Sequence, residues 1–318
     1  MKKDLNKSAA NQFSANLEKN FFKRVSIYLE EMYPLRNIVF GLLFFMSAWC
    51  GIDLLSTPCN GRLLPPKIVF FSGTVTIILL MLLLRIMDEL KDQETDPIHF
   101  PDRPISRGAI YPADLKLFAF VIVVILFILN LFFTHTTFIF LFVFCYACLM
   151  YKYFFLKDRI SKNILMALLT HNPISYLFFL YVFFIFKDNI KTSFPVGRVL
   201  FLGTFFLCSS MSWEIARKIR RPEDETTYQT YSKVIGFIPS LMLPIVLSGI
   251  SIFVITCLYH SIISGLMFID MVVVYLFMVT TFLRFYKKQL VRFDLKTTTE
   301  IFIANIQAVL IVEGILNS

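Results

Sequence analysis

Residues Arg85 to Gly108 read RIMDELKDQETDPIHFPDRPISRG and follow directly on an apolar run at residues 68–84. Asp88, Asp92 and Asp96 stand at steps of four in this stretch. Because an α-helix has 3.6 residues per turn, each step overshoots a full turn by only about 40°, and we expect the three carboxylates on one face of a helix. Unpaired carboxylates at this spacing would repel one another. A hard divalent cation with oxygen ligands accounts for them, and Mg²⁺ carrying phosphate oxygens fits best.

The alternative interpretation of the same acids is a solvated, charged helix end, with Lys91 neutralising part of the charge, as is common at membrane interfaces. The residues that follow favour the metal site. Pro97 introduces a turn, and Arg103 and Arg107 add two permanent cations directly after the acids. Cations beside metal-binding carboxylates suit a diphosphate ligand.

The stretch resembles the first aspartate-rich motif of the UbiA superfamily of integral-membrane prenyltransferases, N-x-x-x-D-x-x-x-D followed by an R-P-x-x-x-G-like turn. Asp92 and Asp96 match the two aspartates, and residues 103–108 (RPISRG) match the turn. Asp88 stands where the family usually has Asn, an exchange that keeps an oxygen ligand and adds charge. The resemblance implies Mg²⁺ as the cofactor, held by Asp88, Asp92 and Asp96.

Composition predicts a polytopic membrane protein. Of 318 residues, 57% are hydrophobic and only 17% are charged, and a soluble domain with this composition could not cover its surface. The formal net charge of +9 raises the question of nucleic-acid binding. The basic residues, however, lie in short loops between apolar runs, which favours the positive-inside distribution and argues against a nucleic-acid partner.

The predicted fold is all-α, with nine transmembrane helices in residues 36–318, each near the 20 residues that cross a bilayer. The UbiA resemblance implies that they surround a central cavity. Residues 1–35 are predicted as an N-terminal segment whose helix at 17–33 is amphipathic and lies on the membrane surface, or alternatively binds a partner. The nine expected spans are 37–55, 67–87, 114–133, 136–155, 163–186, 197–214, 235–257, 262–283 and 299–316.

The distribution of Lys and Arg predicts the orientation. Counting alternate sides of the nine spans, 26 of the 31 basic residues fall on the side of the N-terminus and 5 on the other side. This bias predicts a cytoplasmic N-terminus and a C-terminus on the opposite side. The acids after the second span then face the cytoplasm, and so does the loop after the sixth span.

That second loop holds another charged cluster, WEIARKIRRPEDE at residues 213–225. The superfamily has a second D-x-x-x-D motif here, but this chain has Glu214 at the first acidic position and Lys218 at the second. A protonated lysine cannot ligate a metal, although it binds diphosphate oxygens, as do Arg217 and Arg220.

Two arrangements of the second cluster therefore stay open. One has a single metal, with the cations binding the diphosphate directly. The other has a further metal held by Glu214 together with Asp224 or Glu225.

A third segment, YFFLKDR at residues 153–159, resembles a Y-x-x-x-K-R-like motif of the superfamily. We expect the hydroxyl of Tyr153 one helical turn from Lys157, whose amine reaches a phosphate. Interfacial anchoring by an aromatic and a basic residue is the alternative. Polar residues inside the spans, among them His171, Asn172 and Asp270, are expected to form interhelical hydrogen bonds in preference to contacting an acceptor.

The resemblance implies an enzyme that transfers a prenyl group from a prenyl diphosphate to a small-molecule or lipid acceptor in the membrane. A UbiA-type terpene cyclase, a phosphoribosyl-diphosphate-dependent lipid transferase and a non-enzymatic transporter or lipid-binding protein are the alternatives. The residues implied for catalysis are Asp88, Asp92, Asp96, Glu214 and Lys218, and those for the diphosphate are Arg103, Tyr153, Lys157, Arg217 and Arg220.

Overall fold

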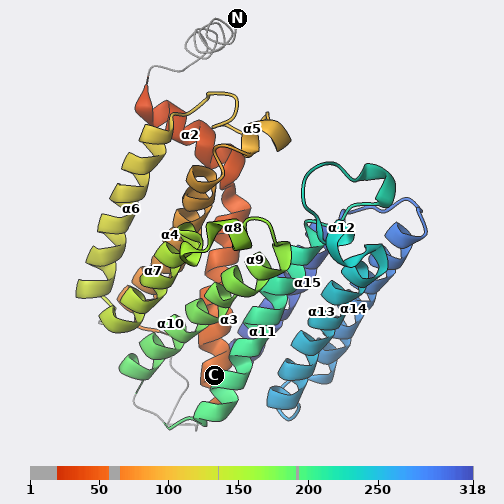
Figure 1. Cartoon of the computed structure of the whole chain (residues 1–318). Coiled ribbons are helices and arrows are strands. Elements are labelled where there is room, and N and C mark those ends of the chain that lie inside the picture. The colour runs from red at the N-terminus through yellow and green to blue at the C-terminus, as the bar shows by residue number, and fades with distance from the viewer. Residues whose placement is uncertain (1–19, 57–64, 135, 191–192, 318) are drawn as a thin grey trace, which may run out of the picture. The chain divides into compact units, whose positions relative to one another are not determined.

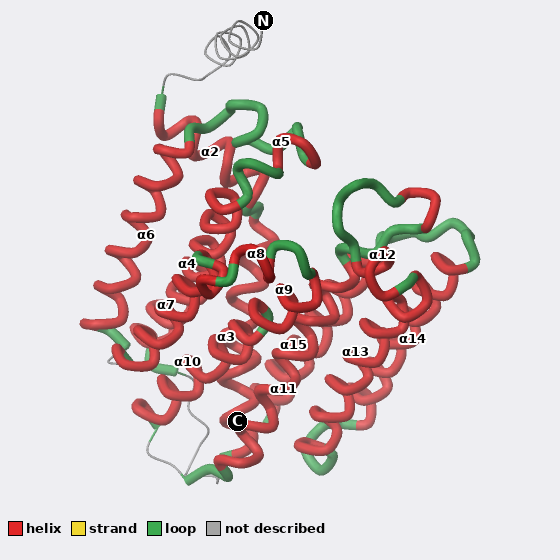
Figure 2. Tube along the Cα trace, viewed as in Figure 1, coloured by secondary structure: helices red, strands yellow, loops and turns green. Residues whose placement is uncertain are grey.

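The structure is a computed structural model that describes residues 20–56, 65–134, 136–190 and 193–317. Within these ranges every regular element is helical (Figure 2). The chain divides into two compact units, the first formed by Met1–Leu42 and Thr74–Phe133 and the second by Leu43–Gly73 and Thr134–Ser318. Figure 1 labels the helices of both units.

The membrane-spanning character predicted from composition is confirmed. In the described part of the chain, eight helical segments are long and apolar enough to cross a bilayer, and α7 (Thr137–Tyr151) is a shorter apolar helix of 15 residues. Large apolar side chains such as Phe138 and Leu266 are exposed, as lipid-facing residues are. The eight are α3 (Leu35–Leu55), α4 (Lys67–Lys91), α6 (Pro112–Phe132), α9 (Ile164–His171) together with α10 (Pro173–Asn189), α11 (Val196–Ala216), α13 (Phe237–Tyr259), α14 (Gly265–Tyr286) and α15 (Leu295–Leu316).

The remaining elements are short. They are α2 (Phe21–Met32), α5 (Asp96–His99), the 3₁₀ turn η1 (Tyr153–Phe155), α8 (Lys157–Ile160), the 3₁₀ turn η2 (Pro222–Asp224) and α12 (Tyr231–Ile235).

In the first unit, the N-terminal helix α2 packs against α6. The side chain of Asn20 caps α2 by accepting a hydrogen bond from the amide of Phe22. Nε and Nη2 of Arg24 lie 2.7 and 2.8 Å from the two carboxylate oxygens of Asp114, in the first turn of α6. The predicted helix at 17–33 is thus confirmed from Phe21 onward, while residues 17–19 lie outside the described residues.

Close backbone approach joins α3 and α4 in the first unit. A Cβ placed on Gly41 would lie 2.6 Å from Cγ1 of Ile78, so only glycine fits at this crossing. The hydroxyl of Tyr33 donates to the Ile78 carbonyl at 2.8 Å. The α4–α6 contact carries a buried polar link, because Nδ2 of Asn130 donates to Oγ1 of Thr76 at 3.1 Å.

In the second unit, buried serines hold α11 against α13. Ser212 donates to the carbonyl of Pro244 at 3.0 Å and lies 3.0 Å from the hydroxyl of Ser248. The hydroxyls of Ser209 and Ser251 lie 3.2 Å apart. Small side chains let the two helices approach closely, and their hydroxyls are satisfied across the interface.

The fifth predicted span is broken in the structure. Because Pro173 has no amide hydrogen and clashes with a preceding helical turn, α9 ends at His171 and α10 begins at Pro173. The interhelical hydrogen bond expected for Asn172 is present, since Ser210 donates to its Oδ1 at 3.1 Å. Asp270 likewise accepts from Asn305 at 2.6 Å, between α14 and α15.

An ion pair between Glu31 and Arg107 predicts a pH dependence of stability. The hydrogen bonds from Arg107, at 2.8 and 2.5 Å, hold the pKa of Glu31 below its ordinary value. A lowered carboxyl pKa contributes stability above the unfolded value of about 4.3, and this contribution is lost as the pH falls through the lowered value. Both side chains are about 40% exposed, so the expected contribution stays below about 1 kcal/mol.

We therefore expect thermal unfolding in detergent to give a slightly lower midpoint for Glu31→Gln than for the wild type at pH 7. The difference should shrink as the pH is lowered below about 4. An offset that is the same from pH 7 to pH 3 would contradict this explanation.

Candidate active site

The aspartate-rich stretch lies in the first unit, where α4 ends. The helix stops at Lys91, Asp92 follows in a bend, and Asp96 is the first residue of the short helix α5. The expectation that all three acids share one continuous helix is therefore wrong beyond Lys91. Proline favours the first turn of a helix, so Pro97 starts a new helix instead of extending α4.

The three aspartates keep a spacing of one backbone turn across this break. The amide of Asp92 bonds to the carbonyl of Asp88 at 3.0 Å, and the amide of Asp96 bonds to the carbonyl of Asp92 at 2.9 Å. The backbone thus still advances by one helical turn from each acid to the next. The side chain of Asp88 is half exposed, whereas Asp96 is buried.

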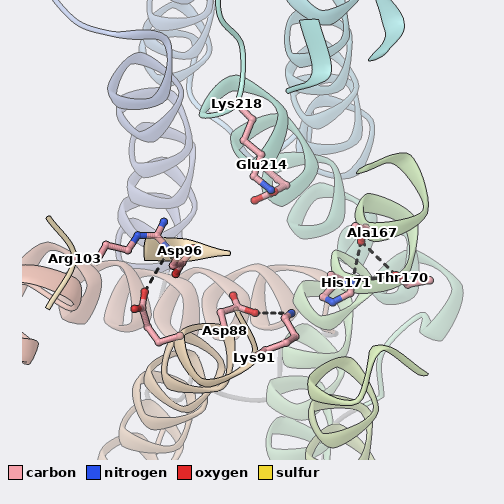
Figure 3. A network of polar contacts seen from close by, with 10 residues as sticks. Asp88, Lys91, Asp96, Arg103, Ala167, Thr170, His171, Glu214 and Lys218 are labelled. Atoms are coloured by element: carbon pink, nitrogen blue, oxygen red, sulfur yellow. Dashed lines mark hydrogen bonds and ion pairs between the residues drawn. The ribbon is translucent and has the colours of Figure 1, made fainter. Parts of the chain in front are cut away.

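Basic side chains neutralise the acids locally (Figure 3). Lys91 lies 2.9 Å from Asp88, as the alternative interpretation of the sequence anticipated, and Arg103 lies 2.5 Å from Asp96. In the described part of the chain, no three His, Cys, Asp or Glu side chains are grouped closely enough to hold a metal ion in this conformation.

The sequence interpretation missed Glu89, which lies among these charges. Its side chain is 1% exposed, pairs with Arg85 one turn earlier, and lies 3.6 Å from Arg103. The signal was present as Arg85-x-x-x-Glu89, an i,i+4 ion pair at a helix end. The steps of four that begin at Asp88 do not include Glu89.

The turn that follows the acids has a backbone conformation that favours glycine at position 108. Gly108 has φ of 77°, in the region that L side chains rarely adopt, and it lies between two turn hydrogen bonds, from Gly108 to Ile105 and from Ala109 to Pro104. Arg103, at the start of the same turn, stacks its guanidinium 4.0 Å from the ring centre of Phe100. The Arg103 cation thus lies between this ring and the Asp96 carboxylate.

Replacing Gly108 with Ala should strain this turn. A left-handed conformation costs an L residue roughly 1–2 kcal/mol, so we expect a lower thermal midpoint. The control is Gly197→Ala in α11, where an added Cβ meets no atom within 4 Å and φ is not positive. Equal midpoints for Gly108→Ala and the wild type would show that the turn tolerates a side chain.

The remaining predicted residues lie in the second unit. Tyr153 belongs to η1, in which residues 153, 154 and 155 have φ of 50°, 50° and 60°, and Lys157 starts the separate helix α8. The prediction that they lie one turn apart on one helix is therefore wrong, because α7 ends at Tyr151. The left-handed turn places Phe154 edge-on against Tyr146 and His171.

Glu214 and Lys218, at the end of α11, form an ion pair of 2.9 Å (Figure 3). Arg217 reaches the other oxygen of the same carboxylate at 2.6 Å and lies over the ring of Trp213. The structure thus brings three of the predicted residues together as one acid between two cations.

The other predicted residues, Arg220, Asp224 and Glu225, lie in the loop after α11. Arg220 donates to Thr226 at 2.7 Å. Glu225 accepts hydrogen bonds from the hydroxyls of Thr230 and Ser232, with the shortest at 2.6 Å, so its carboxylate stabilises the loop. Asp224, in η2, is exposed.

A model of the UbiA prenyltransferase family matches residues 54–306, which include both charged clusters. The chain belongs to the UbiA prenyltransferase family. The predicted superfamily, fold class and enzyme class are thereby confirmed, and the protein is a multi-pass membrane prenyltransferase. A search of curated protein sequences gives no significant match.

Solved structures share the fold. A digeranylgeranylglyceryl phosphate synthase is 16% identical, with a TM-score of 0.59 over 92% of this chain and 99% of that one. A UbiA homologue from Archaeoglobus fulgidus bound to GPP and Mg²⁺ is 13% identical, with a TM-score of 0.56 over 91% and 98% of the two chains. A structure of a UbiA homologue from Archaeoglobus fulgidus bound to DMAPP and Mg²⁺ is 13% identical, with a TM-score of 0.58 over 91% of this chain and 98% of that one.

Proposed function

We propose that this protein transfers a prenyl group from a prenyl diphosphate to an acceptor within the membrane, in a reaction that depends on Mg²⁺. The observation that carries the proposal is the group of acids at the end of α4, spaced by one turn and directly followed by the turn that presents Arg103. Family membership supports an enzyme over a transporter. The Archaeoglobus fulgidus homologue bound to GPP or DMAPP with Mg²⁺ supports the donor and the cofactor.

The residues present fit the metal. Asp88, Asp92 and Asp96 supply only carboxylate oxygens, the donors that Mg²⁺ prefers. Asp88 and Asp96 already form ion pairs with Lys91 and Arg103. A bound divalent cation would take the place of part of this positive charge. When bound, Mg²⁺ would neutralise the leaving diphosphate.

The protein's own cations are suited to a diphosphate leaving group. In the reaction, the bond between the allylic carbon and the diphosphate oxygen breaks, and its electron pair leaves with the diphosphate. Arg103 would stabilise this charge beside the aspartates. Lys218 and Arg217, in the other cluster, are also cations that can bind diphosphate oxygens. The acceptor nucleophile then attacks the allylic cation and loses a proton.

The geometry of the second cluster favours cations over a second metal. Glu214 is already neutralised by Arg217 and Lys218, and Glu225 is engaged by two hydroxyls of its own loop. The residues that we propose to bind diphosphate oxygens are Lys218, Arg217, Arg220, Lys157 and Tyr153. A second metal on Glu214 with Asp224 or Glu225 remains the alternative, and it predicts that Glu214→Gln raises the Mg²⁺ requirement.

The proposed orientation has the N-terminus and the two charged clusters on the cytoplasmic side and the C-terminus on the opposite side. The asymmetry of basic residues, 26 against 5, supports it. Cysteine labelling from each side of sealed vesicles tests it.

The experiment that tests the proposed reaction identifies its product. Purified protein in nanodiscs receives Mg²⁺ and either prenyl diphosphates of graded chain length or phosphoribosyl diphosphate, with and without a cell lipid extract. The products are analysed by mass spectrometry. We expect an extract component whose mass increases by one prenyl group. A cyclised hydrocarbon formed without any acceptor would instead identify a terpene cyclase, and a product formed only from phosphoribosyl diphosphate would identify a lipid glycosyl transfer.

A further inference from the structure

The proposed reaction ends when the acceptor loses a proton, and this step requires a base beside the acceptor. His171 is an ionisable side chain inside a membrane-spanning segment, at the last residue of α9. Ionisable residues are costly in such segments and mark functional positions. The residue is half-buried, so it is neither sealed in the core nor fully exposed.

Hydrogen bonds within α9 determine which ring nitrogen of His171 carries the proton. Nδ1 lies 3.0 Å from the carbonyl oxygen of Ala167 and 3.0 Å from Oγ1 of Thr170 (Figure 3). A carbonyl can only accept, and the Thr170 hydroxyl already donates to the carbonyl of Met166 at 2.7 Å, so Nδ1 is the donor. The neutral ring is favoured because a charged side chain is costly in a membrane-spanning segment. A neutral ring protonated at Nδ1 has its lone pair on Nε2, which can therefore accept a proton.

Neighbours in the second unit hold the ring of His171 in this orientation. Phe154 packs edge-on against it, with the ring centres 6.2 Å apart. The hydroxyl of Tyr146, in α7, donates to the carbonyl of Thr170 at 2.8 Å and so anchors the last turn of α9. The Ala167 carbonyl and the C-terminal end of the helix would stabilise the positive charge that the ring gains with a proton. A fixed orientation and a stabilised charged form are what a general base needs.

The residue after His171 connects this ring to the second charged cluster. Asn172 accepts a hydrogen bond from Ser210 of α11 at 3.1 Å. Ser210 lies one turn before Glu214, so the two share a face of α11 and are about 6 Å apart along its axis. In the proposed function Lys218 binds the diphosphate beside Glu214, and the reacting carbon of the prenyl group is joined to that diphosphate. The break in the span thus lies one turn from the cluster, toward the interior of α11, where an acceptor would meet this carbon.

We propose that His171 is the catalytic base of the reaction and that the acceptor carries a hydroxyl group. A hydroxyl can donate a hydrogen bond to Nε2 before the reaction, whereas a ring C–H is no comparable donor. After the diphosphate has left with its electron pair, an electron pair of the acceptor oxygen forms a bond to the allylic carbon. The O–H bond then breaks, its electrons stay on the oxygen, and the proton passes to Nε2 and from there to water. The product is a prenyl ether, and this role rests on the proposed function.

The first test determines the tautomer of His171 without substrate. The protein in nanodiscs is labelled with ¹⁵N at histidine, and the signals that disappear in His171→Asn are those of His171. The nitrogen chemical shift distinguishes a protonated ring nitrogen from an unprotonated one. We expect a protonated Nδ1 and an unprotonated Nε2 at neutral pH. The opposite tautomer, or a ring protonated at both nitrogens, would overturn the proposal.

The second test measures how turnover is divided between the acceptor and water. The protein receives a prenyl diphosphate, Mg²⁺ and the cell lipid extract, and released pyrophosphate and prenylated extract component are measured in the same sample. Asparagine can keep the hydrogen bond to Ala167 but has no group in the place of Nε2. We expect His171→Asn to lower the prenylated product per pyrophosphate about 100-fold, with prenyl alcohol formed instead. The control His260→Asn changes an exposed histidine after α13 and should keep the wild-type ratio.

Equal ratios in His171→Asn and His260→Asn would overturn the proposal. His171→Gln is the second variant, and it also serves if His171→Asn does not fold. Its amide oxygen can accept a hydrogen bond in the place of Nε2 but takes no proton at neutral pH, so a wild-type ratio in this variant would show that His171 is not a base. A product joined through a carbon–carbon bond would contradict the hydroxyl acceptor.

This inference and the proposed function fail in different ways. If the wild-type protein consumes no prenyl diphosphate, the proposed function is wrong, and the role of His171 falls with it. If the wild-type protein turns over and His171→Asn keeps the wild-type ratio, only the role of His171 is wrong.

Discussion

Replacing Asp92 with Asn is expected to reduce the release of diphosphate from a prenyl diphosphate by about 10²–10³-fold. Asp92 is the middle acid of the three, one backbone turn from each of its neighbours. An amide keeps the shape of the side chain but removes the negative charge that holds a divalent cation. The measurement is the initial rate of pyrophosphate release by protein in nanodiscs at saturating donor and limiting Mg²⁺.

The control for this prediction is Glu94→Gln, the same acid-to-amide change at an exposed position two residues farther on. It should keep wild-type activity and show that charge removal near α5 is not harmful in itself. Raising the Mg²⁺ concentration should recover part of the activity of Asp92→Asn, since a weakened site fills at higher metal concentration. A rate within about threefold of the wild type at limiting Mg²⁺ would contradict the assignment of Asp92 as a ligand.

Replacing Arg24 with Ala should cause a large loss of stability. Arg24 makes two hydrogen bonds to Asp114, and the two side chains are only 10% and 11% exposed. Removing the cation leaves a buried carboxylate without its partner, which typically costs about 3–5 kcal/mol. Asp114 also accepts a hydrogen bond from the Tyr111 amide at the start of α6, so Arg24 gives the cleaner substitution. Reversible unfolding by denaturing detergent, followed by circular dichroism, measures the change.

A double variant, Arg24→Met with Asp114→Leu, separates the charge effect from lost packing. Apolar side chains of similar size need no counter-charge, so this variant should recover most of the lost stability. A cost below about 1 kcal/mol for Arg24→Ala alone would show that water reaches the Asp114 carboxylate and that the pair behaves as a surface ion pair.

The spans were predictable because long apolar runs between charged loops leave few alternatives in a membrane. The expected run 197–214 corresponds to α11 at Val196–Ala216, and 114–133 corresponds to α6 at Pro112–Phe132. The break at Pro173 has a signal in the sequence, since a proline stands in the middle of an expected span. The shortening of α7 was not, because it depends on the left-handed turn that begins at Tyr153.

The candidate site was predictable as a set of residues but not as a set of contacts. Periodicity placed Asp88, Asp92 and Asp96 one turn apart, and that spacing holds along the backbone. It could not reveal which basic group each acid meets, because Arg103 returns to Asp96 and Glu89 through the irregular segment after α5, which has no periodic pattern. Likewise, Glu225 is held by hydroxyls later in its own loop, and no regular spacing signals such contacts.

The most direct test of the proposed function is whether pyrophosphate release needs both a prenyl diphosphate and Mg²⁺. Wild-type protein in nanodiscs is supplied with a cell lipid extract and a panel of prenyl diphosphates, in Mg²⁺ or in excess EDTA, and released pyrophosphate is measured over time. We predict release with at least one donor in Mg²⁺ and none in EDTA. No release from any donor, or release at the same rate in EDTA, would contradict the proposed Mg²⁺-dependent prenyl transfer.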